Sequence, residues 1–228
     1  MFIGRTNHGC VIDHLQRVIV FGGETKSGLT NEIFYYKMFE NEWKKPIPSG
    51  ERPTPRDNFA MNIYNSQIYV FGGYQQGKSL NEMYIFDLSD LQWTKLDAGK
   101  MVPSPRVGVT GHIFGSKIMY VGGCDFDNQC YNEVWQYNII TLDYTILYKS
   151  MFNIHNADVF NLGFGPTATS GEVIFFYGGC GLSNTCQANF AAFNTTENCP
   201  DDCGKHGICK ASGCLCNNDW TGNFFYKK

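Results

Sequence analysis

Four apolar runs in this chain each end in a pair of glycines, and the pairs recur at a nearly constant interval. The runs are RVIVFGG, QIYVFGG, KIMYVGG and EVIFFYGG, which end in Gly22-Gly23, Gly72-Gly73, Gly122-Gly123 and Gly178-Gly179. A fixed period of this length is typical of architectures in which each repeat is one supersecondary unit that packs on its neighbours. The chain is therefore limited to folds built from similar units of about 50 residues.

Other features recur in the same register. An Asn-Glu pair follows each of the first three glycine pairs, and a large aromatic residue stands eleven positions after each glutamate, at Trp43, Trp93 and Tyr144. Two repeats begin with Pro-x-Pro-Arg, which ends at Arg56 and Arg106, and each of these arginines precedes its first glycine by 16 residues. The units therefore share one local structure.

Each unit is predicted to consist of β-strands. The segment FAMNIYNSQIYVFGG contains two β-rich runs around Asn65-Ser66, and NEMYIFDLSDLQWTKL contains two more around Ser89-Asp90. Short polar turns between such runs are hairpin signatures. Four short strands in about 50 residues are the content of one propeller blade.

This pattern resembles the kelch repeat over about residues 4–195. The resemblance implies an all-β fold, a kelch-type β-propeller, with units at about 1–52, 53–102, 103–150 and 151–198 that form residues 1–198. Kelch propellers usually have six blades, although the number varies, so we expect these four units to belong to a larger propeller. The resemblance also implies a rigid disc whose loops bind partners.

The repeated residues are expected to be structural rather than ligand-binding. Each glycine pair ends a strand where the backbone bends and packs closely, because glycine alone adopts such angles freely. Trp43 and Trp93 are expected to supply apolar area between blades. Arg56 and Arg106 are expected to hold neighbouring blades together by hydrogen bonds.

Two units carry a cysteine pair in the same loop. Cys124 and Cys180 each follow a glycine pair directly, and Cys130 and Cys186 come six residues later. Neither loop contains a histidine, which disfavours a metal site. We therefore predict the disulfides Cys124–Cys130 and Cys180–Cys186, each closing a loop whose constraint stabilises by about 2 kcal/mol.

Asn194-Thr195-Thr196 is an N-x-[ST] sequon. By the register of the repeats it follows the third strand of the fourth unit, so we expect Asn194 to be exposed and glycosylated.

The last part of the chain changes character. From Cys199 the cysteines are spaced C-x3-C-x5-C-x4-C-x-C and are followed by Asp-Trp-Thr-Gly. This resembles an EGF-like module over residues 199–228, and the resemblance implies the disulfides Cys199–Cys209 and Cys203–Cys214. The module is incomplete, because no cysteine stands where Cys216 would find its partner. Cys10 is the other cysteine without an assigned partner, and a Cys10–Cys216 bridge rests on parity alone.

Composition excludes several classes of partner. The formal net charge is −3, which gives no reason to expect nucleic acid. No apolar segment reaches the ~18 residues of a membrane span, and MFIGRTNHGC is not a signal peptide. Nine of ten cysteines nevertheless lie between positions 124 and 216, which favours an oxidising compartment. We therefore expect a fragment of a larger chain that enters the secretory pathway.

No catalytic motif, cofactor motif or metal-ligand cluster is recognisable, so we expect no enzyme, no cofactor and no bound metal. The favoured interpretation is a non-catalytic extracellular or cell-surface interaction or adhesion scaffold, since kelch blades with an EGF-like module resemble the ectodomains of attractin-like proteins. Its partners would be proteins, another copy of itself or the rest of its own propeller. The alternatives are an intracellular kelch adaptor or assembly subunit with reduced cysteines and, more remotely, a propeller oxidase.

Overall fold

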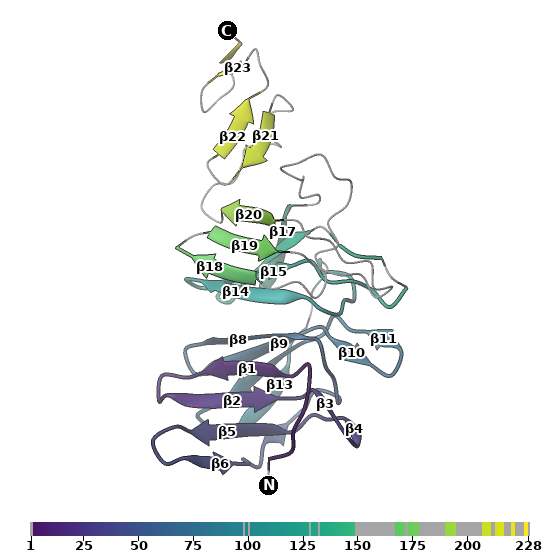
Figure 1. Cartoon of the computed structure of the whole chain (residues 1–228), viewed down its shortest axis with the longest axis vertical. Helices are drawn as coiled ribbons and strands as arrows, with labels where there is room; N and C mark the ends of the chain where they lie inside the picture. Colours follow the sequence, from purple (N-terminus) through teal and green to yellow (C-terminus); the bar gives the residue numbers. More distant parts are fainter. Residues whose placement is uncertain are drawn as a thin grey trace.

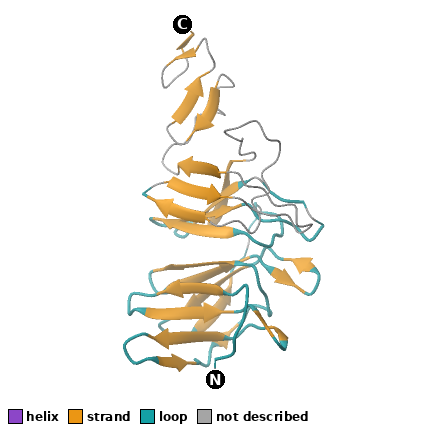
Figure 2. Ribbon diagram, in the orientation of Figure 1, coloured by secondary structure: helices purple, strands orange, loops and turns teal. Residues whose placement is uncertain are grey.

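The structure, a computed structural model, describes most of the first three repeats and parts of the remainder. Described in full are residues 2–97, 99, 101–127, 129–131, 133–147, 167–171 and 173–177, with the backbone alone of 148, 190–194, 207–210, 213–216, 220–221 and 226–227. Every regular element in these residues is a β-strand (Figure 2). They contain no helix long and apolar enough to cross a membrane.

The first repeat forms a four-stranded antiparallel sheet, here called blade 1. Its strands in spatial order are β1 (Gly9–Ile12), β2 (Arg17–Phe21), β5 (Ile33–Lys37) and β6 (Glu42–Lys44). Between β2 and β5 the chain forms a small hairpin of β3 (Glu24–Thr25) and β4 (Gly28–Leu29).

The second repeat, blade 2, has the same four-strand order plus one additional strand. Its own strands are β8 (Ala60–Tyr64), β9 (Gln67–Phe71), β12 (Met83–Asp87) and β13 (Gln92–Lys95). A second small hairpin, β10 (Tyr74–Gln75) with β11 (Lys78–Ser79), follows β9. The segment that leaves blade 1 contributes β7 (Ser49–Gly50), which pairs in parallel with the outer edge of β13.

The third and fourth repeats continue the series. Blade 3 consists of β14 (Thr110–Phe114), β15 (Lys117–Val121), β16 (Val134–Asn138) and β17 (Asp143–Tyr148). Blade 4 has three strands among the described residues, β18 (Thr167–Ser170), β19 (Val173–Tyr177) and β20 (Phe190–Asn194). Beyond it lie two short hairpins, β21 (Gly207–Lys210) with β22 (Gly213–Cys216) and β23 (Trp220–Thr221) with β24 (Tyr226–Lys227).

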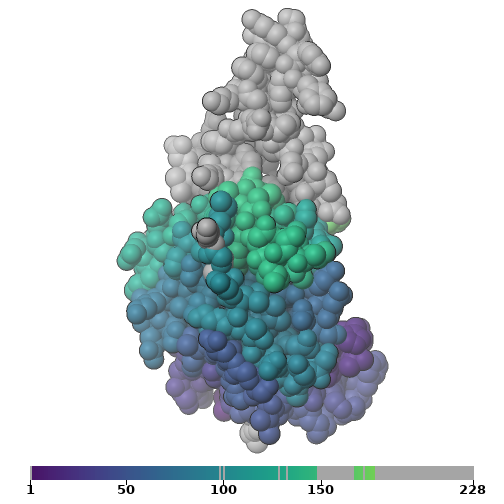
Figure 3. Space-filling view, turned by 180° about the vertical axis from the view of Figure 1, so that it is seen from behind, coloured from purple at the N-terminus to yellow at the C-terminus, as the bar shows by residue number. Residues whose placement is uncertain are grey.

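The blades follow one another in chain order, and their first strands are neighbours (Figure 1). Seen from behind, the described part of the first three repeats forms one continuous surface (Figure 3). The Asn62 side-chain amide on β8 donates to the Gly111 carbonyl on β14 at 2.8 Å. His112 Nε2 on β14 lies 2.8 Å from Thr167 Oγ1 on β18. This arrangement confirms the predicted all-β blades, with hairpin turns at Asn65-Ser66 and Ser89-Asp90.

The hydrophobic core lies between the blades rather than within a single sheet. Alternate residues of each second strand face opposite ways, so one set packs on the preceding blade and the other on the following blade. One cluster joins blades 1 and 2 and contains Ile19, Phe21, Ile68, Val70 and Trp93. Equivalent clusters join blade 2 to blade 3 and blade 3 to blade 4. Each blade is therefore stabilised mainly by its neighbours.

The two repeated tryptophans differ in their environment. Trp93 is 1% exposed, and its ring lies 4.9 Å from the Phe21 ring of blade 1. Trp43 is 38% exposed and stacks on Phe2 at 4.0 Å, on the face of blade 1 that points away from blade 2. Trp93 therefore lies between two blades, whereas no described blade covers the face of blade 1 that carries Trp43.

This difference predicts unequal effects of the same truncation. Trp93→Ala removes a large side chain from a closed inter-blade core and should lower the free energy of unfolding by about 3–5 kcal/mol. Trp43→Ala removes a partly hydrated ring and should cost at least about 1 kcal/mol less. Urea unfolding of both variants measures the difference. Equal losses would show that the exposed face of blade 1 is as tightly packed as the blade 1–blade 2 core.

Candidate functional site

A buried arginine lies beneath the glycine pair of blade 2 and another beneath that of blade 3. The Arg56 guanidinium donates to the Gly72 carbonyl at 3.1 Å, the Glu82 carboxylate at 2.8 Å and the Thr54 carbonyl at 3.2 Å. Its exposed fraction is zero, and it lies 5.1 Å from the centre of the Tyr84 ring. These contacts are all within the second repeat, so the arginine side chain stabilises the end of its own blade.

Arg106 repeats this arrangement in the third unit. It donates to the Gly122 carbonyl at 2.9 Å and to the Glu133 carboxylate at 3.0 Å. Burial lowers the pKa of the Arg106 guanidinium, and the hydrogen bond and charge of Glu133 oppose that shift. Arg5 also donates to the Gly22 carbonyl, at 3.0 Å, and lies 3.6 Å from Glu32.

The backbone of the same arginines makes the link between blades. The Gly23 N–H donates to the Arg56 carbonyl at 2.9 Å, and the Gly73 N–H donates to the Arg106 carbonyl at 2.9 Å. A Cβ atom at Gly22 would lie 2.8 Å from the Arg56 carbonyl oxygen, at a φ of +63°. Arg56 and Arg106 therefore join neighbouring blades through hydrogen bonds to their backbone carbonyls, whereas the 16-residue spacing places each guanidinium under the glycine turn of its own unit.

The asparagines of the repeated Asn-Glu pair add a second inter-blade contact. The Asn31 side-chain amide donates to the Pro53 carbonyl at 2.9 Å, and Asn81 donates to the Pro103 carbonyl at 3.2 Å. Each asparagine thus holds the linker that leads into the following blade.

The segments directly after the glycine pairs project from one end of the blades. In blades 1 and 2 these segments are the β3–β4 and β10–β11 hairpins, and in blade 3 the segment is the loop from Cys124 to Cys130. Figure 1 shows both hairpins extending to the same side of the molecule. We call these three segments the arms. Since the linkers between blades reach the same end, this end of the propeller presents irregular loops on a rigid support.

The third arm is closed by a disulfide. Cys124 and Cys130 are joined with an S–S distance of 2.01 Å, and their backbones form an antiparallel bridge. Asp125 accepts hydrogen bonds from the Gln129 N–H at 2.8 Å and the Tyr131 hydroxyl at 3.2 Å inside this loop. These hydrogen bonds and the disulfide hold the described part of the loop.

The second and third arms contact each other. The Phe126 N–H donates to Ser79 Oγ at 2.7 Å, and the Phe126 ring stacks near the Tyr74 ring at 5.7 Å between centres. Phe126 is nevertheless 49% exposed. An aromatic ring that is held in place yet still exposed can bury further apolar area against a partner without a large loss of side-chain entropy.

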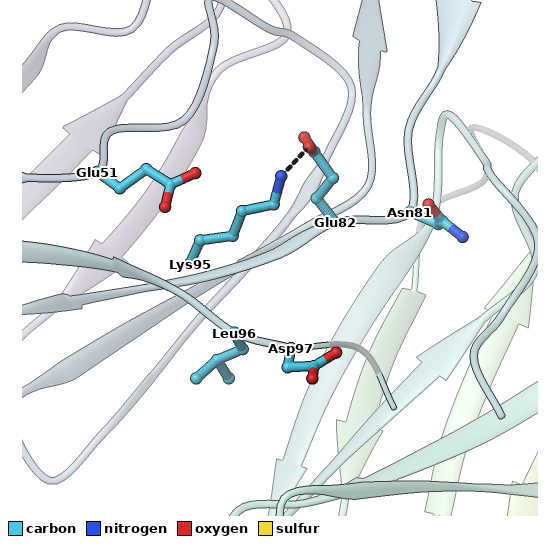
Figure 4. A pocket seen from close by; sticks show the side chains of 6 residues that line it. All are labelled: Glu51, Asn81, Glu82, Lys95, Leu96 and Asp97. Atoms are coloured by element: carbon cyan, nitrogen blue, oxygen red, sulfur yellow. Dashed lines mark hydrogen bonds and ion pairs between the residues drawn. The ribbon is translucent and has the colours of Figure 1, made fainter. Parts of the chain in front are cut away.

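A shallow pocket of about 360 Å³ lies between the linker into blade 2 and the end of blade 2 itself (Figure 4). It is lined by Glu51, Asn81, Glu82, Lys95, Leu96 and Asp97. Lys95 Nζ donates to Glu82 Oε1 at 2.6 Å, which raises the pKa of the Lys95 ammonium group. Burial raises the pKa of the Glu82 carboxyl, but hydrogen bonds from Lys95 and Arg56 outweigh it, so the pKa is lowered overall. The lining therefore holds a satisfied ion pair, with no nucleophile–base pair among its residues.

One buried carboxyl group near the arms has an oxygen atom that accepts no hydrogen bond. Asp57 is buried at the base of the second arm, where its backbone bridges that of Tyr74, and its Oδ1 accepts no hydrogen bond. Burial raises the pKa of the Asp57 carboxyl, and hydrogen bonds from Asn7 and Asn58 act against this. Val107 occupies the equivalent position of blade 3. Within the described residues, no three His, Cys, Asp or Glu side chains form a group that could hold a metal ion.

A family comparison agrees with this architecture. Residues 1–179 match the model described as the KLHDC2/KLHL20/DRC7 Kelch-repeats domain. The chain belongs to the kelch-repeat family. No curated protein matches the chain. The all-β strands and this family match together fit a kelch β-propeller. Kelch-repeat domains are generally non-catalytic interaction domains, which implies protein partners.

The remaining predicted sites are only partly within the described residues. Cys10 lies on β1 as an exposed free cysteine. Asn194 is the last residue of β20, and Cys209, Cys214 and Cys216 lie on β21 and β22, where the backbone alone is described. The positions outside the described residues are Gly178, Gly179, Cys180, Cys186, Cys199 and Cys203.

Sequence reasoning missed two features at the end of the propeller that carries the arms. It did not find β7, where the Ser49 N–H donates to the Leu91 carbonyl at 3.0 Å and the N–H of Glu51, the next residue after the strand, donates to the Trp93 carbonyl at 3.1 Å. It also did not find the contact between Tyr74 and Phe126. One sequence signal could have indicated that these segments lie side by side: the polar loops ETKSGLT and YQQGKSL occupy the same register as the cysteine loop of the third repeat.

Proposed function

We propose that this chain is a non-catalytic scaffold that binds a protein partner at the arm end of its kelch propeller. The observation that carries the proposal is Phe126, which is half exposed while its backbone and ring are held by Ser79, Tyr74 and the Cys124–Cys130 disulfide. Exposed aromatic residues on rigid supports are frequent binding hot spots.

The proposal predicts that a partner is lost when Phe126 is truncated. Affinity capture compares three baits: the wild-type chain, Phe126→Ala and Phe39→Ala. The wild type and Phe39→Ala should retain the same amount of the same partner, and Phe126→Ala should retain at least about fivefold less of it. Phe39 is a matched control, because it is 89% exposed in the turn between β5 and β6, at the opposite end of blade 1. Equal retention by all three proteins would contradict the proposal.

We further propose that the scaffold is extracellular or lies at the cell surface, with residues 199–228 forming an incomplete EGF-like module and Asn194 carrying a glycan. The cysteine spacing after Cys199 supports the module, and the Cys124–Cys130 disulfide supports an oxidising compartment. A kelch propeller beside an EGF-like module is the combination that resembles attractin-like proteins.

Alkylation of the natively produced chain tests the compartment. In an oxidising compartment Cys124, Cys130, Cys180 and Cys186 should accept the reagent only after reduction, and mass spectrometry of peptides reports each site. Cys10, an exposed free thiol, should react before reduction and serves as the internal control. Free thiols at all four other positions would instead favour an intracellular kelch adaptor with reduced cysteines.

A further inference from the structure

Two carboxyl groups are buried among the described residues, and they differ in how they are paired. Asp13 and Asp57 are 3% and 4% exposed. The Asp13 carboxylate forms an ion pair with Arg17 at 2.7 Å and accepts the Leu15 and Arg17 backbone N–H groups at 3.0 and 2.9 Å. Asp57 forms no ion pair within the described part of the chain, and its Oδ1 accepts no hydrogen bond. A buried carboxylate with so few partners is costly, whereas a neutral carboxyl group is not.

The groups that face Asp57 offer it no positive charge. The Asn7 side-chain amide, on the segment before β1, donates to Asp57 Oδ2 at 3.5 Å. Burial raises the pKa of the Asp57 carboxyl, the amides of Asn7 and Asn58 act against this, and the negative charge of Glu24 on the first arm adds to it. Burial is the main cause that lowers the pKa of His8, the residue after Asn7, so its imidazole is neutral at neutral pH.

The repeat does not need a carboxyl group at this position. The Asp57 N–H donates to the Tyr74 carbonyl at 3.2 Å, and the Tyr74 N–H donates to the Asp57 carbonyl at 2.8 Å. In blade 3 Val107 and Cys124 form the same backbone bridge, with hydrogen bonds of 2.8 and 2.9 Å. The bridge therefore forms equally well beside an apolar side chain. A costly ionisable group that the fold does not require is a candidate for a functional role.

We propose that Asp57 is a proton-sensitive switch at the base of the second arm, which is held by the neutral carboxyl group and loosened by the ionised one. Loss of the proton leaves a negative charge in a site with almost no exposed surface, and water reaches that charge when the bridge between Asp57 and Tyr74 opens. The Tyr74 ring stacks near the Phe126 ring, so opening of the bridge also releases Phe126. The switch concerns the arm itself and does not depend on the partner proposed for it.

The direction of the pH dependence follows from the raised pKa of Asp57. The pKa of this carboxyl group is about 3.9 in the unfolded chain and higher in the folded chain, mainly because of burial. The stability that the neutral group gives is therefore complete below about pH 3.9 and is lost as the pH rises through the raised pKa. The arm should be held most firmly at acidic pH.

Native-state hydrogen exchange of the full chain, at about pH 4 and about pH 7, tests this switch. After correction for the intrinsic pH dependence of exchange, the opening equilibrium constant of the Tyr74 N–H should be at least about threefold larger at the higher pH, which corresponds to half a pKa unit. The Cys124 N–H is the internal control, because it lies in the equivalent bridge beside Val107 and should show no such increase.

Two variants assign the effect to one carboxyl group. Asp57→Asn cannot ionise, so its Tyr74 N–H should open equally at both pH values. Asp13→Asn removes the other buried carboxyl group and should leave the increase at Tyr74 intact. An increase that persists in Asp57→Asn overturns the proposal. So does a wild type in which Tyr74 and Cys124 show the same pH dependence, a comparison that needs no variant to fold.

Discussion

The structure depends on the close approach of each blade to the glycine pair of the preceding one. The Gly23 and Gly73 N–H groups donate to the carbonyls of Arg56 and Arg106, and the glycines before them, Gly22 and Gly72, leave no room for a side chain. The guanidinium of the same arginine then binds the next glycine pair along the chain. Each of these arginines therefore joins its blade to the preceding one through its backbone carbonyl and stabilises its own blade through its side chain.

This junction also determines where function can lie. The arms begin directly after the glycine pairs, so their bases are anchored by the backbone hydrogen bonds that join neighbouring blades. The disulfide in the third arm and the Tyr74–Phe126 contact extend that rigidity outward, and Phe126 remains exposed at the end of it. The ion pair in the pocket of blade 2 is already satisfied within the protein. Protein binding by the arms fits these observations better than chemistry in the pocket.

Much of this fold was predictable from the register of the repeats. The positions of the second strands, the hairpin turns and the glycine pairs all depend on local pattern, and β9 and β15 end where the sequence indicates. Trp43 and Trp93 show the limit of such reasoning, because their local patterns match and only their neighbours in space differ. The strand β7 was not predictable for a related reason: a short segment between prolines has no alternation, and it pairs only because the β13 edge lies beside it.

The close approach at the glycine pair is tested most directly by comparing Gly72→Ala with Gly77→Ala in urea unfolding. Both glycines have positive φ angles, +71° and +81°, so alanine carries a similar conformational cost of about 1–2 kcal/mol at each. A Cβ at Gly72 would lie 2.9 Å from the Arg106 carbonyl oxygen, whereas no atom lies within 4 Å of a Cβ at Gly77. Gly72→Ala should therefore lose at least about 1 kcal/mol more than Gly77→Ala. Equal losses would contradict the account, because they would mean that the blades do not depend on this contact.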